Sequence, residues 1–322
     1  MEKLNSDPQQ GNDDHWTTYQ GTGAGKHIVL VSGDEEYRSE EALPMLAKIL
    51  AIHHGFKCTV LFAIDPETGI IDPKNQTNIP GLHHLETADM MILFTRFREL
   101  PDQQMKYIID YTNRGKPIMG LRTATHAFNY TRNLQSPYAK YDFKNEDFPG
   151  GYGQQILGET WINHHGHHGK ESARGIINEE MVAHPILQGV QNVWGPSDVY
   201  TVNELTGDAH VLVWGQVLVG MEPTDEPNLD KPQMPLAWIK TYTGDTGKTS
   251  RVFCTTMGAS VDLENEGLRR LLVNSCYWCM EMEDQIPAES QVEYVGEYQP
   301  TFFGFGTYQK GMRPSDFGLQ LK

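Results

Sequence analysis

The stretch His27-Ile28-Val29-Leu30-Val31-Ser32-Gly33-Asp34 decides the fold of this chain. Its run of apolar residues is typical of a strand that is buried on both faces, and the polar residues after it mark a turn at the strand's carboxyl end. A helix is expected next, because Leu43, Leu46 and Leu50 recur at helical spacing and Gly55 provides a stop. A buried strand, a short turn and a helix together form the first unit of a parallel α/β sheet.

The same alternation continues along the first part of the chain. Strands are expected at 57–63, 88–95 and 116–121, and a second helix begins at Pro101 and ends before Gly115. Crossovers of this length join parallel strands with a right-handed connection. The pattern therefore predicts an α/β protein with a doubly wound parallel sheet.

The second half of the chain departs from this pattern. Residues 131–170 are rich in Asn, Gly, His and aromatic residues. A connection of this length without regular structure is uncommon in a compact domain, so we expect a functional insertion. A helix from about Asn265 closes the domain, after strand-like runs at 199–203, 209–215, 235–242 and 251–256.

Three parts of the chain are expected from its composition. Residues 1–25 are polar and predict a flexible lead-in, and residues 26–283 predict the α/β domain. The tail over 284–322 is rich in aromatic residues, unlike disordered tails. We therefore expect it to pack as an extended segment on the domain or on a partner subunit, where it could support a homo-oligomer. Its aromatic residues are Tyr294, Tyr298, Phe302, Phe303, Phe305, Tyr308 and Phe317.

The charge balance argues against several classes of partner. The 322 residues include 26 basic and 42 acidic side chains, for a net charge of −16. Such a chain repels phosphate backbones and anionic headgroups, so neither a nucleic-acid nor a membrane partner is expected. No apolar run reaches the roughly 20 residues of a bilayer helix, and no signal-peptide pattern is visible. The expected location is the cytoplasm for the sequence as written, or the periplasm or exterior if a signal peptide was removed.

The spacing of Cys276 and Cys279 resembles that of redox or metal-binding pairs. Both cysteines, however, share one helical face with Leu268, Leu271 and Leu272. A thiol on an apolar stripe behaves as a small hydrophobic group, so core packing is the favoured interpretation.

Polar side chains follow the expected parallel strands at their carboxyl ends, where open sheets bind ligands. Each group also has a structural interpretation: acidic residues favour helix N-termini, arginines pair with carboxylates, and a histidine can be a satisfied core residue. A small ligand rich in hydroxyl groups would need such a convergence of polar groups. The residues are Asp34, Glu35 and Glu36 after the first strand, Arg96 and Arg98 after the third, and Arg122, Thr123 and His126 after the fourth.

The segment 161–169 carries four histidines within five residues, which suggests metal binding. Adjacent histidines in a strand point to opposite faces, and no His-Glu-x-x-His pair accompanies them. A metal at the His164–His168 loop is therefore kept as the weaker alternative. Acid–base or ligand-binding use of His164 or His167 is favoured.

Taken together, these segments resemble the ThuA-like (trehalose-utilisation) family, a branch of the class I glutamine-amidotransferase-like superfamily. The resemblance spans about residues 26–282 and implies a flavodoxin-like sheet and a role in disaccharide catabolism, in particular of 3-keto-glucosides. The aromatic tail looks like an extension found in a bacterial subgroup. The matching segments are 27–38, 94–98, 120–128, 157–161 with the following histidines, 184–186, 235–238 and 251–258.

The chain departs from the superfamily at one informative position. Its amidotransferases carry a nucleophilic cysteine on the turn after a central strand, and here the turn 120–124 has none. Without a thiolate no thioester can form, so glutamine amidotransferase activity is not expected. Many ThuA-like relatives have histidine where this chain has Arg122, which cannot act as a base and would bind or polarise an oxygen.

The leading hypothesis is a sugar isomerase, lyase or hydrolase that acts on a disaccharide or 3-keto-glycoside by non-covalent acid–base chemistry. No dinucleotide fingerprint follows the first strand, and no cofactor is expected. The alternatives are a non-catalytic carbohydrate-binding or accessory subunit and a metal-dependent hydrolase that uses the histidine-rich loop. The expected catalytic residues are His126, His164 and His167, and the expected sugar-binding residues are Asp34, Glu35, Glu36, Arg96, Arg122, Thr123 and Glu159.

Overall fold

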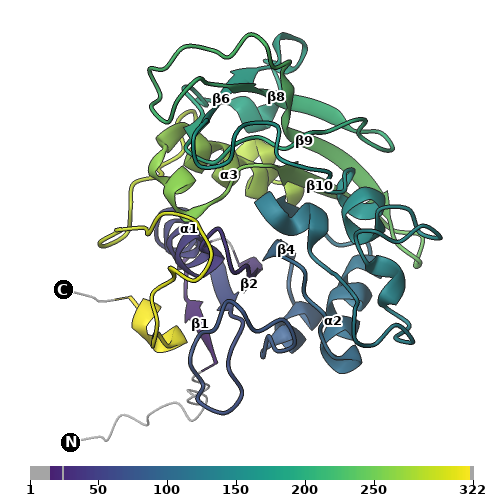
Figure 1. The fold of residues 1–322 in the computed structure, drawn as a ribbon. Helices are drawn as coiled ribbons and strands as arrows, with labels where there is room; N and C mark the ends of the chain where they lie inside the picture. Colours follow the sequence, from purple (N-terminus) through teal and green to yellow (C-terminus); the bar gives the residue numbers. More distant parts are fainter. Residues whose placement is uncertain (1–14, 24, 320–322) are drawn as a thin grey trace, which may run out of the picture.

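The computed structural model describes residues 15–23 and 25–319 (Figure 1). Residues 1–14 of the expected lead-in lie outside this part. The described strands form one mixed sheet in the order β1-β3-β2-β4-β5-β10-β9-β8-β6-β7, with helices packed against it. The α/β character expected from the sequence is confirmed.

Five strands form the parallel half of the sheet. They are β2 (His27–Gly33), β3 (Lys57–Leu61), β4 (Met90–Thr95), β5 (Ile118–Leu121) and β10 (Thr249–Thr255). They lie side by side in the order β3-β2-β4-β5-β10, and every neighbouring pair is parallel. If the five strands are numbered 1 to 5 along the chain, this order is 2-1-3-4-5. Their carboxyl ends therefore share one edge of the sheet.

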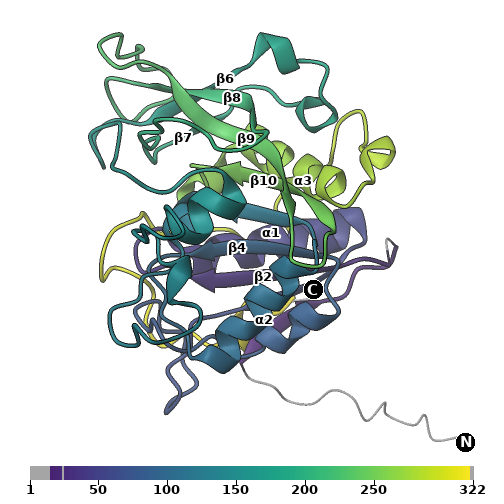
Figure 2. The same cartoon turned by 90° about the vertical axis from the view of Figure 1, so that its right-hand side faces the viewer.

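Helices cover both faces of this half. Helices α1 (Ser39–His54) and α3 (Glu266–Cys279) contribute to the same apolar cluster as alternate residues of β2, and α2 (Asp102–Asn113) contributes to the cluster on the other side (Figure 2). The stop expected at Gly55 is confirmed, since this residue caps α1 with φ 74°. Cys276 and Cys279 are buried in the α1/α3 cluster, so the core interpretation of these thiols is confirmed.

The other half of the sheet is antiparallel, which corrects the expectation of a wholly parallel sheet. It consists of β9 (Met234–Thr243), β8 (His210–Val217), β6 (Ala173–Ile177) and β7 (Trp194–Gly195). Strands β9 and β10 form a hairpin in which Thr243 pairs with Thr249, and so short a connection can join only antiparallel strands.

Two expectations about local structure are wrong. The run 199–203 forms no strand, because Tyr200 makes only an isolated bridge with His164. Within the expected lead-in, β1 (Trp16–Tyr19) pairs antiparallel with β3 at the edge of the sheet. The alternating burial of β1 and the hydrogen bond from the Tyr19 hydroxyl to the Phe317 carbonyl (2.7 Å) explain why this segment is ordered.

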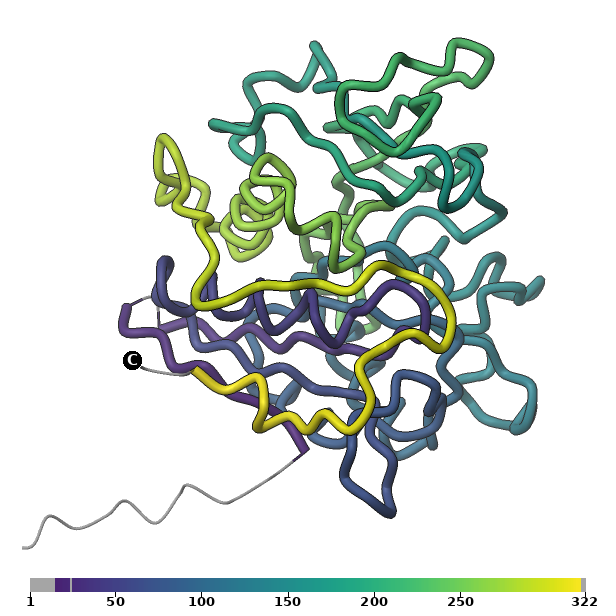
Figure 3. Tube along the Cα trace, turned by 60° about the vertical axis from the view of Figure 1, so that its left-hand side comes forward, coloured from purple at the N-terminus to yellow at the C-terminus, as the bar shows by residue number. Residues whose placement is uncertain are grey.

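The tail from residue 284 to 319 crosses the body beside α1 and reaches β1 (Figure 3). The Thr301 amide donates to Glu41 Oε2 (2.7 Å), and the Gly304 amide donates to the Glu36 carbonyl (2.8 Å). Further along, the Phe317 ring stacks on Phe62 at 5.6 Å. These contacts fasten the tail along its length. No helix in the described part of the chain is both long and apolar enough to cross a bilayer.

The burial of the Glu40 side chain in α1 can be tested through its effect on stability. Its side chain is buried, neither carboxylate oxygen has a hydrogen-bond partner, and burial raises its pKa to about 8. The native state therefore holds the proton more tightly than the unfolded chain, so stability falls as pH rises from about 4.5 to 8. Glu40→Gln should stabilise the protein by about 2 kcal/mol at pH 8 and by much less at pH 5, as measured by urea unfolding. The exposed Glu67→Gln serves as control, and an equal gain at both pH values would contradict the interpretation.

Candidate functional site

The candidate site lies at the edge of the sheet where the parallel strands end. The turn after β2 supplies Glu35 and Glu36, the turn after β4 supplies Arg96, and the turn after β5 supplies Arg122. Two histidines of the 131–170 insertion complete the site. The convergence expected from the sequence is thus present, although several of its members have other roles.

Asp34 and Thr123 hold the turn after β2 together. Both are fully buried, and the Thr123 hydroxyl donates to Asp34 Oδ2 at 2.6 Å. Asp34 Oδ1 accepts from the backbone amides of Glu36 (2.7 Å) and Tyr37 (2.5 Å). These bonds occupy both side chains, so they position the turn rather than contact a ligand, which differs from the sugar contacts expected.

Glu35 bridges the guanidinium groups of Arg96 and Arg98. Arg98 is fully buried and also donates to backbone carbonyls, whereas the Arg96 side chain is 16% exposed and lies 3.4 Å from Glu36. Burial raises the pKa of Glu35 against the opposing effect of the two arginines. Arg96 is therefore the cation of this group that a ligand can reach.

Arg122 is enclosed rather than exposed to substrate. Its guanidinium lies between the rings of Tyr37 and Tyr200, 4.3 and 4.2 Å from their centroids. It donates to the Thr256 carbonyl (2.6 Å) and to Asp198 Oδ1 (3.2 Å), and none of its side chain is exposed. A residue sealed in this way offers no donor to a sugar oxygen, so this structure does not bring Arg122 into the expected binding role. The structure gives it a positioning role toward Asp198.

Asp198 is the central residue of the site that the sequence analysis missed. Its Oδ2 lies 2.8 Å from His164 Nδ1 and its Oδ1 lies 3.1 Å from His168 Nδ1. Burial alone would raise its pKa, but the contacts with His164, His168 and Arg122 hold it well below the usual value. Asp198 lies between a Gly-Pro pair and a strand-like run, and nothing in that pattern marks it as a partner of histidines 30 residues earlier.

His168 takes the place that was expected for His167. His168 Nε2 lies 3.3 Å from Glu36 Oε1, and its hydrogen bonds with Asp198 and Glu36 raise its pKa to about 9. Burial alone would raise the pKa of Glu36, but His168 and Arg96 lower it. His167 is exposed and donates its backbone amide to Glu171 Oε2 (2.6 Å).

The histidine segment forms a turn rather than a strand, and not all four of its histidines converge. A turn around Gly166 brings His164 and His168 to the same side, with ring centroids 4.5 Å apart. His165 lies elsewhere, with Nε2 2.8 Å from the Pro232 carbonyl. Two of the four histidines converge on one carboxylate. We call Glu36, His164, His168 and Asp198 the histidine–carboxylate cluster.

His126 is a core residue in this structure. It is 2% exposed and lies among aromatic rings, with Phe97 at 5.1 Å and Trp161 at 5.2 Å between centroids. Burial, together with the nearby charges of Arg96 and Arg122, holds its pKa well below the usual value. An enclosed imidazole has no access to a substrate proton, so the structure does not support its expected catalytic role.

Glu159 is also buried, and burial raises its pKa to about 8. Its electrostatic neighbour is the buried thiol of Cys254. Among the interactions of the described residues, none joins Glu159 to the histidine–carboxylate cluster, so it is not brought into the site.

Solvent reaches the cluster through His164 and His168, whose side chains are 29% and 31% exposed. The tail forms one side of this opening, because Phe303 packs 5.0 Å from the His168 ring. Phe305 is 61% exposed and its ring lies 5.1 Å from the Arg96 guanidinium.

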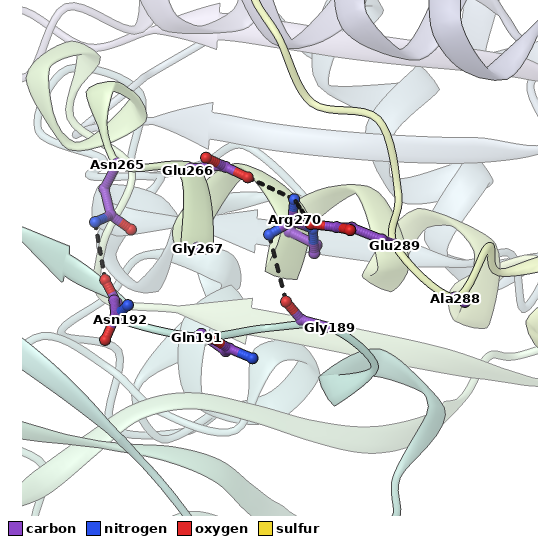
Figure 4. A pocket seen from close by; sticks show the side chains of 9 residues that line it. All are labelled: Gly189, Gln191, Asn192, Asn265, Glu266, Gly267, Arg270, Ala288 and Glu289. Atoms are coloured by element: carbon purple, nitrogen blue, oxygen red, sulfur yellow. Dashed lines mark hydrogen bonds and ion pairs between the residues drawn. The ribbon is translucent and has the colours of Figure 1, made fainter.

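A cavity of about 470 Å³ lies elsewhere, between the turn at 189–192 and the start of α3 (Figure 4). Its cation, Arg270, is paired with Glu266 at 2.6 Å and with Glu289 at 3.4 Å. No residue of the histidine–carboxylate cluster lines this cavity, so its volume adds nothing to the site.

No family model and no curated protein matches this chain. A solved structure from Parabacteroides merdae, described as a ThuA-like protein, aligns with a TM-score of 0.50 and 13% identity over 87% of this chain and 97% of that one. This chain has a ThuA-like fold. A second ThuA-like structure, from Bacteroides uniformis, aligns with a TM-score of 0.49 and 14% identity over 81% of this chain and 95% of that one. The likeness to the structure from Parabacteroides merdae confirms, at the level of the fold, the resemblance seen in the sequence.

The buried Arg122–Asp198 pair should be essential for stability. Arg122→Met leaves the enclosed Asp198 carboxylate without its guanidinium partner, and we expect a loss of about 3 kcal/mol or more in urea unfolding. Lys106→Met removes an exposed i,i+4 pair with Asp110 and should leave stability nearly unchanged. Equal stability of the two variants would contradict the positioning role of Arg122.

Proposed function

We propose that this chain is a carbohydrate-processing enzyme that acts on a disaccharide or 3-keto-glycoside by non-covalent acid–base chemistry. The observation that carries the proposal is the histidine–carboxylate cluster beside the reachable cation Arg96. The ThuA-like fold and the family resemblance supply the substrate class. The order 2-1-3-4-5 of the parallel strands supports the finer expectation of a flavodoxin-like, doubly wound core.

His164 is the best-placed proton acceptor. Its Nδ1 faces Asp198, which orients the ring, and 29% of its side chain is exposed. A carboxylate that fixes one ring nitrogen leaves the other to exchange a proton with substrate. This role replaces the one expected for His126, which is enclosed.

The reaction that fits these groups is proton abstraction next to a keto group. The proton on the carbon beside the carbonyl moves to His164 Nε2, and the electron pair becomes an enolate whose oxygen faces the Arg96 guanidinium. Expulsion of the glycosidic oxygen on the next carbon completes an elimination, and that oxygen takes up the proton. An isomerisation would result instead if the hydroxyl on the deprotonated carbon gave its proton to the enolate oxygen and became the new carbonyl, while the former carbonyl carbon took back the proton from His164.

Exposed aromatic rings of the tail would hold the sugar. Phe305 and Phe302 are 61% and 49% exposed, and Phe305 lies against Arg96. An exposed aromatic ring at the edge of a polar site offers a flat apolar surface for the C–H face of a pyranose. The tail is therefore proposed to be part of the substrate site.

The sealed positions of His126 and Arg122 favour a second candidate function. Since neither residue reaches solvent, the chain could bind a carbohydrate without converting it. Binding alone would raise the thermal stability with the logarithm of the sugar concentration above Kd, and mass spectrometry would find the sugar unchanged after long incubation.

The role of His164 is tested with a panel of disaccharides and their 3-keto derivatives, with products followed by mass spectrometry. His164→Ala should lower kcat by a factor of about 10² to 10⁴, because the general base is lost. His167→Ala is the matched control, since it removes an exposed imidazole from the same loop, and it should keep full activity. Equal turnover of the two variants would refute the assignment of the base.

The role of the tail is tested by Phe305→Ala. The variant should raise KM by about 3- to 10-fold with kcat unchanged, which corresponds to the loss of roughly 1 kcal/mol of aromatic packing. Leu229→Ala removes an even more exposed apolar side chain from another loop and should leave KM unaltered. A fall in kcat with constant KM would argue against a binding platform.

A further inference from the structure

The two histidines and the aspartate of the cluster present their ligand atoms to one point. One atom each from His164, His168 and Asp198 lie within 4.8 Å of one another. Ligand atoms about 2.1 Å from a zinc ion at tetrahedral corners are roughly 3.4 Å apart, so only small shifts would place an ion between them. Three protein ligands with an open position are the usual number for a catalytic metal ion.

We propose that His164, His168 and Asp198 bind one divalent transition-metal ion of the zinc or cobalt type. Two imidazoles and one carboxylate suit such ions, whereas Mg²⁺ and Ca²⁺ prefer oxygen ligands alone. The proposal concerns the site of the proposed function but does not depend on it, because binding of the ion needs no sugar.

The surroundings of the three ligands are those that support a metal ion. His168 faces Asp198 with Nδ1 and Glu36 with Nε2, at 3.1 and 3.3 Å. A histidine that ligates a metal usually gives its other ring N–H to a carboxylate, which fixes the ring. The carboxylate of Asp198 is fixed in turn by Arg122 at 3.2 Å. Glu36 and Arg122 are therefore positioning residues for the ligands.

The backbone of the loop is also adapted to this convergence. Gly166 is buried between the two histidines, and a Cβ on it would lie 2.9 Å from the Asp198 Cβ. Any larger residue would push the loop away from Asp198. The close approach places two histidines four residues apart on one carboxylate, while His165 and His167 remain outside the cluster.

An ion can enter this site from solvent. The His164 and His168 side chains are about 30% exposed, whereas Asp198 is fully buried beneath them. A ring that ligates the ion through Nδ1 carries its own proton on Nε2 and cannot accept another there. Metal binding and the base role proposed for His164 are therefore alternative uses of the same ring.

The experiment measures binding directly on the full chain. Protein is stripped with a chelator, dialysed and titrated with Zn²⁺ by calorimetry and with Co²⁺ by visible absorption. We expect one equivalent of metal for the wild type and for the matched control His167→Ala, with Co²⁺ bands of a protein-ligated ion. His164→Ala and His168→Ala should weaken binding by a factor of at least about 10², and Glu36→Gln, which keeps all three ligands, by about 10- to 100-fold.

Two outcomes would overturn the metal site. One is binding no stronger in the wild type than in the His164→Ala and His168→Ala variants, and the other is an equal loss in His167→Ala. Circular dichroism and thermal unfolding establish that each variant is folded. If the histidine variants fail to fold, the wild-type Co²⁺ spectrum and Glu36→Gln decide the matter. Metal binding without sugar turnover would support the ion site and count against the proposed function. Sugar turnover by protein that binds no metal would support the proposed function and count against the ion site.

Discussion

The buried guanidinium of Arg122 is the constraint on which the site depends. A cation without solvent is costly unless it is paired, and here two tyrosine rings, the Thr256 carbonyl and Asp198 compensate it. Its positive φ of 45° aims the side chain across the edge of the sheet, a strained conformation that this surrounding network maintains. Because Arg122 fixes Asp198, it also determines where His164 and His168 lie. A residue that never meets substrate thus sets the geometry of those that can.

The change from parallel to antiparallel strands explains how distant parts of the sequence meet. The parallel strands deliver charged turns to one edge, as their common direction requires. The antiparallel extension then supports the insertion, which returns over that edge with its histidines and pairs with the segment around Tyr200 through a single bridge. The site therefore combines two parts: a rigid carboxylate–arginine layer beneath, and a turn-rich layer of imidazoles and aromatic rings above.

Sequence reasoning predicted the first layer well and the second poorly. A buried apolar run such as β2 is readily recognised as a parallel strand, and the residues after such strands must lie at the same carboxyl edge of the sheet. Glu36 and Arg96 could therefore be placed at the site without coordinates. His168 could not be told from His167, because the choice depends on a turn at Gly166 that has no periodic signal. Asp198 was missed since its partners are remote in sequence. The burial of Arg122 and His126 depends on aromatic rings from four separate segments, those of Tyr37, Phe97, Trp161 and Tyr200. The edge strand β1 was missed because four residues are too few for a pattern.

The path of the tail couples the start of α1 to the aromatic side of the site. Arg38, the N-cap residue of α1, has a left-handed conformation with φ 61° and donates to the Thr301 hydroxyl and to the Gly304 carbonyl. In the first turn of α1, the Glu41 carboxylate accepts a hydrogen bond from the Thr301 hydroxyl. The contacts with Arg38 and Glu41 therefore hold Phe303 and Phe305 beside His168 and Arg96, so a change at the start of α1 would also shift the aromatic side of the site.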